Sequence, residues 1–429
     1  MVHIPRVMRS VAQAVLCAGV LLAVTMQAVA EPVALDPLIQ EALARNASLQ
    51  RAKHQWKAAT HRIGQAWALP DPSVGFAVMG DDLMTPLGPQ EQVYEAEQMV
   101  PFPLKLWERR KVAKAEAQAT ESLYRAAERD VVRDVSTVYY DLYAADASVR
   151  ALEEILGVLR NLEQVVQSRY AGMGGSQRDV AKAQAEVSMV LERLFMLRQQ
   201  RDSLAARLNA LLNRDTNTPV GPLTQPGKPQ LTYDLDQLLE TAATARPELQ
   251  EAASMLQRER HANRLAQLEY LPDLSVGFQH VGIGDGTTSD PDDGRDAWMI
   301  PLRFTVPLWQ NRLIGGVREA RRNLRASEAG LTDARKMAEF DIKDRYYRYA
   351  AATKVVELYE NALIPEAQLA FQSDEAAYQA GKQDALNFLD SERVYLNAKV
   401  TYHQAFAESL KSYAELERAV GRPLTETSP

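Results

Sequence analysis

Apolar residues in the proline-poor parts of the chain recur with a seven-residue period. The clearest run lies between residues 187 and 211, where successive members are spaced by three or four residues. Its members are Val187, Val190, Leu194, Leu197, Leu204, Leu208 and Leu211, interrupted by the polar Arg201. This spacing predicts long helices that pack against one another as coiled coils.

The proline-poor stretches are long. Residues 104–218 contain no proline, and residues 308–422 contain only Pro365. Both are rich in strong helix formers. Each stretch predicts a helical hairpin, with turns at 171–177 and 380–385, and a helix over 104–171 would be on the order of 100 Å long. Gly157 and Pro365 occupy matching positions, which predicts the same local break in both hairpins.

Four short segments have a different period, because apolar and polar residues alternate along them. They lie at about 72–80, 92–101, 274–283 and 297–307. In the last segment Trp298, Ile300 and Leu302 alternate with Met299 and Pro301, among others. Strict alternation predicts amphipathic strands, and about ten residues with one apolar face are typical of a transmembrane β-strand.

The chain is one unit written twice. Leu-Pro-Asp at 69–71 recurs at 271–273, Val-Pro at 100–101 recurs at 306–307, and Tyr-Tyr at 139–140 recurs at 346–347. The offset rises only from 202 to 207 residues, as expected for a duplication with small loop insertions. We therefore expect repeat 1 at 31–215, a Pro/Gly-rich linker at 216–230 and repeat 2 at 231–429.

The first thirty residues have the pattern of an export signal. Arg6 and Arg9 precede an apolar run, and Ala28-Val29-Ala30 follows it. A basic start, a short apolar core and an A-x-A end predict a secretory signal peptide at 1–30. A single transmembrane anchor is the alternative, although the core is shorter than a span requires. The only cysteine, Cys17, lies inside this segment.

Composition narrows the function classes. The formal net charge is −7 and the pI is near 5.6, so nucleic acid is not an expected partner. The mean hydropathy is −0.30, and beyond residue 30 no apolar stretch is long enough for a membrane helix. The histidines show no metal-ligand spacing, and nucleophile and phosphate-loop motifs are absent. We expect no enzyme activity, no cofactor and no resident metal.

Four amphipathic strands cannot close a barrel alone. Unpaired edge groups in lipid cost several kcal/mol each, and transmembrane barrels have about eight strands or more. Two copies of the chain would supply about eight strands and three copies about twelve. The faces opposite the apolar ones hold small or polar residues such as Ser73, Gly75 and Thr305. Because a water-filled pore needs the wider barrel, three copies are favoured.

These features together resemble the TolC-like outer membrane efflux protein family. The resemblance rests on the duplicated layout, the Leu-Pro-Asp segments, the Val-Pro-Phe-Pro-Leu-Lys-Leu segment at 100–106 and the tyrosines before the hairpin turns. It implies a mainly α fold with a small β part, in which a homotrimer forms a β-barrel of about twelve strands continued by an α-helical barrel.

The resemblance also implies location and partners. The channel would lie in the outer membrane of a Gram-negative bacterium, in contact with its lipid, with a long periplasmic part. It would conduct substrates passively from a periplasmic adaptor and an inner-membrane pump of the RND type. The segment at 100–106 leans toward the heavy-metal efflux branch, although Leu104 stands where that branch often has glycine. A duct for type I protein secretion is an alternative, and a periplasmic adaptor or structural coiled coil is an alternative of another class.

Three groups of residues are candidates for function. In the family, polar and acidic residues after the second hairpin turn close the periplasmic end. Here that periplasmic gate would consist of Gln383, Asn387 and Asp390. The alternatives are that Asp390 is an ordinary solvated helix residue or that it pairs locally with Arg393. The candidates for adaptor contact at the hairpin tips are Tyr170, Gly172, Gly174, Gly175, Tyr378, Gly381 and Lys382. Trp107, Trp298 and Trp309 are the expected membrane-interface aromatics.

Overall fold

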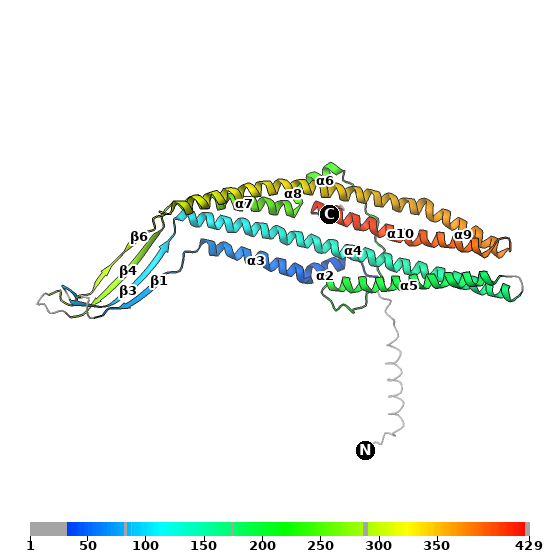
Figure 1. Ribbon diagram of the computed structural model, residues 1–429, viewed down its shortest axis with the longest axis horizontal. Coiled ribbons are helices and arrows are strands. Elements are labelled where there is room, and N and C mark those ends of the chain that lie inside the picture. The colour runs from blue at the N-terminus through cyan, green and yellow to red at the C-terminus, as the bar shows by residue number, and fades with distance from the viewer. Residues whose placement is uncertain (1–31, 81–83, 87, 173–175, 286–290, 425–429) are drawn as a thin grey trace, which may run out of the picture.

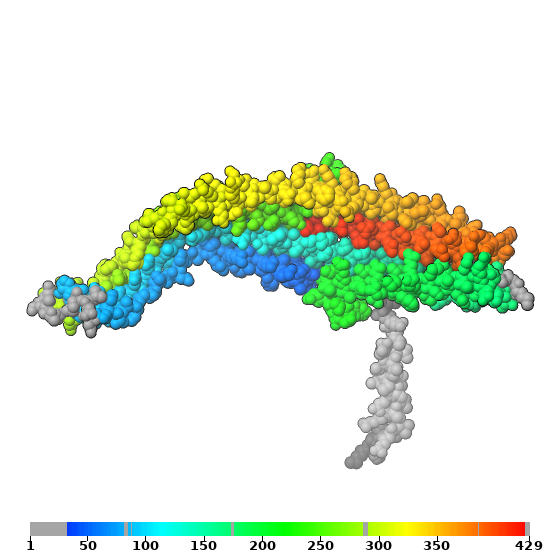
Figure 2. Space-filling view, in the orientation of Figure 1, coloured from blue at the N-terminus to red at the C-terminus, as the bar shows by residue number. Residues whose placement is uncertain are grey.

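The chain forms a long, gently curved body with a small sheet at one end and helix tips at the other (Figure 1). The computed structural model describes residues 32–80, 84–86, 88–172, 176–285 and 291–424. The expected signal peptide and the tip residues Gly174 and Gly175 lie outside these ranges. Repeat 1, in blue to green, and repeat 2, in green to red, run side by side along the body (Figure 2).

Both repeats contain two short helices, a β-hairpin and a long helical hairpin. The elements of repeat 1 are α2 (Leu35–Arg45), α3 (Ala47–Trp67), β1 (Ser73–Val78), β2 (Met84–Thr85), β3 (Gly88–Val100), α4 (Pro103–Ala171) and α5 (Gln177–Leu211). Those of repeat 2 are α6 (Leu235–Ala245), α7 (Pro247–Leu268), β4 (Leu274–Ile283), β5 (Ala297–Met299), β6 (Leu302–Phe304), α8 (Gln310–Leu358), η1 (Tyr359–Leu363), α9 (Ile364–Gln379) and α10 (Ala385–Val420). This mainly α, duplicated fold confirms the expected fold class.

The heptad positions form the core between the helical hairpins. Val190, Leu194 and Leu197 of α5 are buried in one cluster with residues of α4, α9 and α10. Arg201, which interrupts the heptads, turns its guanidinium to the Asp146 carboxylate at 2.9 Å. No helix in the described ranges is long and apolar enough to cross a membrane.

The predicted break shared by both hairpins is wrong for repeat 1. α4 is an unbroken α-helix through Gly157, because glycine weakens a helix but keeps its N–H. In repeat 2 Pro365 has no N–H, and the turn before it widens into the π-helix η1. There the Ile364 N–H bonds to the Tyr359 carbonyl five residues back.

The four predicted strand segments form one antiparallel sheet in the order β1-β3-β4, and β5 and β6 both pair with β4. The segment near 92–101 is longer than expected, since β3 begins at Gly88. The predicted continuous strand at 297–307 is wrong. Pro301 lacks an N–H for the ladder, so β5 and β6 are separate, although its carbonyl still accepts from the Gly277 N–H at 2.9 Å. A Cβ on Gly277 would lie 2.9 Å from the Pro301 ring, so glycine is required there.

One buried joint fastens repeat 2 to repeat 1 where the strands become helices. The Asp273 carboxylate accepts from the Phe102 N–H at 2.8 Å and from the Lys105 ammonium at 2.9 Å. Lys105 also donates to the Leu271 carbonyl at 2.8 Å, and its side chain is only 2% exposed. A buried ammonium needs such partners, so this Leu-Pro-Asp segment is bound tightly to the start of α4.

Two buried tyrosines fasten the linker to the helices. The Tyr139 hydroxyl lies 3.0 Å from the Val33 carbonyl and 2.7 Å from the Thr224 carbonyl. On the repeat 2 side, the Tyr349 hydroxyl donates to the Pro229 carbonyl at 2.9 Å. The linker therefore crosses from one repeat to the other with one such hydrogen bond at its middle and one at its repeat 2 end.

Removal of the Tyr139 hydroxyl is expected to destabilise repeat 1. Tyr139→Phe leaves the Thr224 carbonyl without its donor, whereas the Val33 carbonyl still accepts from the Thr224 N–H, so we expect a loss of about 1–2 kcal/mol in the free energy of unfolding. Tyr349→Phe, which removes the donor of the Pro229 carbonyl, should cost a similar amount. The measurement is thermal or denaturant unfolding followed by circular dichroism in detergent. Tyr347→Phe is the control, because Tyr347 is 60% exposed; equal losses for Tyr139→Phe and Tyr347→Phe would contradict the assignment.

Candidate functional site: the two-faced sheet and the hairpin tips

One face of the sheet is apolar and open. Cross-strand partners share a face, and the register places Phe76 opposite Tyr94, Phe278 opposite Ala96, and Val276 opposite Leu302. Large side chains on this face are exposed although they are hydrophobic. They are Val74, Phe76, Val78, Tyr94, Val276, Phe278, Trp298, Leu302 and Phe304. A contiguous apolar surface of this kind indicates contact with lipid or with another protein.

The opposite face is polar. Gly75 pairs with Glu95, which pairs with Gln279, while Ser275 pairs with Arg303. The Arg303 guanidinium bonds to the Glu95 carboxylate at 2.9 Å and also to Glu97. A sheet with one apolar and one charged face separates an apolar environment from water.

The three predicted aromatic residues lie at the two ends of this sheet. Trp107 is in the first turn of α4 and meets the ring of Trp67 edge-on, with 6.1 Å between centroids. Trp309 precedes α8 and is 79% exposed. Trp298 lies on β5 at the far end, where it stacks on Phe278. Exposed aromatic rings at both ends of an apolar face are typical of membrane interfaces.

At the other end of the body, Tyr378 joins the tips of the two helical hairpins. Its ring is buried against Phe388, and the Arg169 guanidinium lies 4.6 Å from the ring centroid. Arg169 also donates to the Tyr378 carbonyl at 3.2 Å. Sequence reasoning missed Arg169, because its contacts with Tyr378 join residues 209 positions apart, and it missed Phe388, which packs on Tyr378 across the turn between α9 and α10. Tyr170, by contrast, is exposed.

The remaining predicted tip residues lie around the two turns. Gly172 ends α4, and Gly381 adopts φ +69°, a left-handed conformation that favours glycine. The Lys382 N–H closes that turn on the Ala377 carbonyl at 3.0 Å. Of the predicted gate residues, Gln383 donates to Asp374, whereas Asn387 and Asp390 are exposed on the first turns of α10.

The alternative that Asp390 pairs with Arg393 is wrong. Arg393 directs its guanidinium to Glu186 of α5, at 2.7 Å, rather than to Asp390. Asp390 and Arg393 both line a small groove between α5 and α10. The acidic side chain of Asp390 is therefore free to face solvent near the tips.

A further carboxyl, Glu392, lies next to this ion pair in the core. Its side chain is 1% exposed, and neither of its oxygens has a hydrogen-bond partner within the described ranges. Burial raises the pKa of the Glu392 carboxyl to about 7, and the nearby Glu186 carboxylate adds to the effect. The sequence signal is a glutamate at a heptad position, between Leu389 and Leu396.

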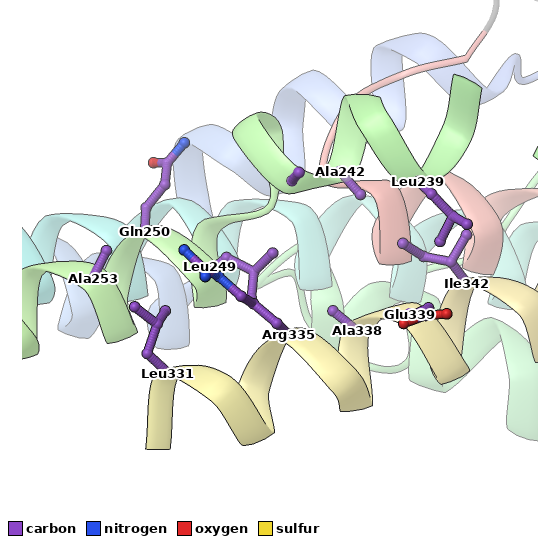
Figure 3. Close-up of a pocket in the computed structure, with 11 residues that line it drawn as sticks. Leu239, Ala242, Leu249, Gln250, Ala253, Leu331, Arg335, Ala338, Glu339 and Ile342 are labelled. Carbon is purple, nitrogen blue, oxygen red and sulfur yellow. The ribbon is translucent and has the colours of Figure 1, made fainter. Parts of the chain in front are cut away.

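A groove between α6, α7 and α8 measures about 450 Å³ (Figure 3). Residues from all three helices line it, including Leu239, Ala242, Leu249, Ala253, Leu331 and Arg335. At the position equivalent to Leu331, repeat 1 has Tyr124, which stacks on Trp56 with 5.4 Å between centroids. The groove is thus space that larger side chains fill in repeat 1.

Comparison with known proteins identifies the family. A model of the outer membrane efflux protein family matches residues 38–214 and 238–422, which cover most of both repeats. The chain belongs to the outer membrane efflux protein family. Its members are efflux proteins, so the chain is a transport protein rather than an enzyme, and the alternative of a periplasmic adaptor or structural coiled coil is set aside.

Three solved structures share the fold of this efflux protein. The outer membrane protein VceC from Vibrio cholerae is 20% identical over 91% of this chain and 97% of its own, with a TM-score of 0.77. The MtrE outer membrane channel of Neisseria gonorrhoeae, solved in an open state, is 16% identical over 92% and 90%, with a TM-score of 0.74. CusC is 17% identical over 91% and 92%, with a TM-score of 0.77. Comparison with curated proteins finds no match.

Glu392 is expected to make the stability of the tips depend on pH. Folding raises the pKa of Glu392 from 4.5 to about 7, so the folded protein holds its proton over a pH range in which the unfolded chain has lost it. The stability from this difference is fully present below about pH 4.5 and is lost as pH rises to about 7. We expect the free energy of opening of α10 to fall by about 3 kcal/mol over this window, and Glu392→Gln to remove the dependence. Hydrogen exchange of α10 amides at pH 5 and pH 8, corrected for intrinsic rates, measures it.

Glu366→Gln is the matched control, because Glu366 is an exposed acid on α9 of the same hairpin. It should keep the pH dependence of the parent protein. If Glu392→Gln keeps it as well, another group is responsible.

Proposed function

We propose that this efflux protein is the exit duct of a tripartite efflux system. Three copies, exported by the signal peptide at 1–30, would form a β-barrel of about twelve strands in the outer membrane. The long helices would continue the duct into the periplasm, where a periplasmic adaptor and an RND-type inner-membrane pump deliver substrate. In this proposal, conduction through the duct is passive.

The two-faced sheet carries this proposal. Its apolar face suits lipid, and its polar face, with Arg303 between Glu95 and Glu97, suits a water-filled lumen. Among the residues that the structure describes, the outer strands β1 and β6 each pair on one side only, so closure requires further copies. Trp107 and Trp309 on one side and Trp298 on the other fit the two lipid interfaces.

The hairpin tips are the proposed periplasmic end. Three copies of Asp390 would form an acidic ring, with Asn387 and Gln383 beside it. The ring would favour the passage of cations, and its three carboxylates would repel one another and move apart unless their charges are screened. The exposed Tyr170, Gly172 and Lys382 are the proposed contacts for the adaptor, together with Gly174, Gly175 and Gly381. Tyr378 supports them from within the core, through Arg169 and Phe388.

Conductance in a planar bilayer tests the duct and its gate. Detergent-purified protein should be a trimer by native mass spectrometry and should form ion-conducting pores. We expect Asp390→Asn to reduce both the preference of the pore for cations and the extent to which divalent cations block it, because the acidic ring is neutralised. Asp390→Glu, which keeps the charge, is the matched control and should behave as the parent. A protein that forms no pores would contradict the duct; unchanged selectivity in Asp390→Asn would contradict only the gate.

For the cargo we propose metal cations, on the resemblance of the segment at 100–106 to the heavy-metal branch and on the acidic gate. A Gram-negative strain that lacks this chain should become more sensitive to metal cations and recover when the gene is supplied. Sensitivity to drugs alone would assign drug efflux. Loss of secretion of a large protein would assign the type I duct instead.

A further inference from the structure

A single chain leaves two open edges, one from each repeat. In the sheet, β1 is the outer strand on the repeat 1 side, and β5 and β6 are outermost on the repeat 2 side. The helices follow the same order, with α3 packed on α4, α4 on α7 and α7 on α8. Repeat 1 therefore ends in β1 and α3, and repeat 2 ends in β6 and α8.

The boundary between the repeats shows how two such edges are joined. There the Asp273 carboxylate of repeat 2 binds the Phe102 N–H and the Lys105 ammonium of repeat 1. The joint is built from a Leu-Pro-Asp segment on one side and the first turn of a long helix on the other. Each chain contains a second copy of both halves.

The second halves can be identified by position. Asp71 is the third residue of the other Leu-Pro-Asp segment. α8 begins at Gln310 as α4 begins at Pro103, so by helix position, one residue beyond the offset of the Val-Pro pairs, Trp309 is equivalent to Phe102 and Arg312 to Lys105. The first-turn hydrogen bonds agree, because the Arg312 N–H bonds to the Trp309 carbonyl at 3.1 Å, as Lys105 bonds to Phe102 at 2.8 Å.

Within one chain these two halves do not meet. Asp71 lies at the repeat 1 edge and Arg312 at the repeat 2 edge, and both are exposed. In the described ranges neither forms an ion pair, whereas their equivalents Asp273 and Lys105 are paired and Lys105 is buried. The cation at Arg312 and the acid at Asp71 have the complementary charges that the internal joint uses.

We propose that Asp71 of one copy and Arg312 of the next form an ion pair that closes each boundary between subunits. The Asp71 carboxylate accepts from the Arg312 guanidinium and from the Trp309 N–H, and Arg312 also donates to the carbonyl of Leu69, as Lys105 does to that of Leu271. The inference rests on the proposed trimer and names the residues that join its subunits. A guanidinium is suited to this role because it can bind a carboxylate through two parallel hydrogen bonds.

Charge reversal tests the pair. Arg312→Asp alone and Asp71→Arg alone place like charges at the boundary, and we expect each to speed dissociation of the detergent-purified trimer about tenfold or more. The combined Asp71→Arg/Arg312→Asp chain restores the pair with exchanged charges and should recover most of the loss. The rate is followed by native mass spectrometry and by the temperature at which trimers dissociate on a mild-detergent gel.

Arg321→Asp is the matched control. Arg321 is an exposed arginine on α8, nine residues from Arg312 and so on the opposite side of the helix. The trimer of the Arg321→Asp variant should dissociate at the same rate as the parent trimer. If Arg312→Asp matches Arg321→Asp, or if the exchanged pair recovers nothing, the proposed contact is overturned.

Cysteine crosslinking keeps the test decisive if the charge variants do not assemble. The chain has no cysteine beyond Cys17, so Asp71→Cys with Arg312→Cys should give crosslinked dimers and trimers on oxidation. Gln98→Cys with Val276→Cys, which face each other across β3 and β4, should link only within a chain. A trimer without intermolecular links overturns the contact and leaves the duct intact. A parent protein that is monomeric and forms no pores contradicts the duct itself.

Discussion

The joint between Asp273 and Lys105 is the interaction on which the rest of the structure depends. It fastens the start of β4 to the start of α4, and so it ties the sheet and the helices of the two repeats together at one point. With that point held, β3 and β4 pair in the register that places Tyr94, Val276 and Phe278 on one face. A one-residue slip would move those side chains to the polar face. The buried ammonium makes such a slip costly, because Lys105 would lose its partners.

The body transmits this alignment over a long distance. α4 runs without a break from the sheet to the hairpin tips, so the orientation at Lys105 is carried to Arg169 by one continuous helix. α8 and α9 are interrupted by the π-helix η1 before Pro365, and this side of the molecule has a place where the helix direction can change. The two hairpins therefore differ in helix continuity although they descend from one unit.

The sequence predicted most of the layout because its signals are local. Heptad spacing reports helix packing, alternation reports strands, and the recurrence of Leu-Pro-Asp reports the duplication. The errors arose where a single residue acts through hydrogen bonds. Pro301 divides a strand whose apolar alternation continues through it, and Gly157 does not break α4 because its N–H remains in the helix. Glu392 occupies a heptad position between Leu389 and Leu396, but a glutamate favours a solvated helix face until its burial is known.

The amino-acid sequence by itself determined the duplicated α-helical fold, the amphipathic strands and the family resemblance, since all of these follow from the spacing of residue types along one chain. Only the tertiary structure decided which distant groups meet. The Asp273 carboxylate beside Lys105, the Arg169 guanidinium over Tyr378 and the Arg393–Glu186 pair each join residues more than 160 positions apart. Periodicity carries no information on such contacts, because the same side chains would fit either a solvated helix face or an interface. Packing alone selects between them.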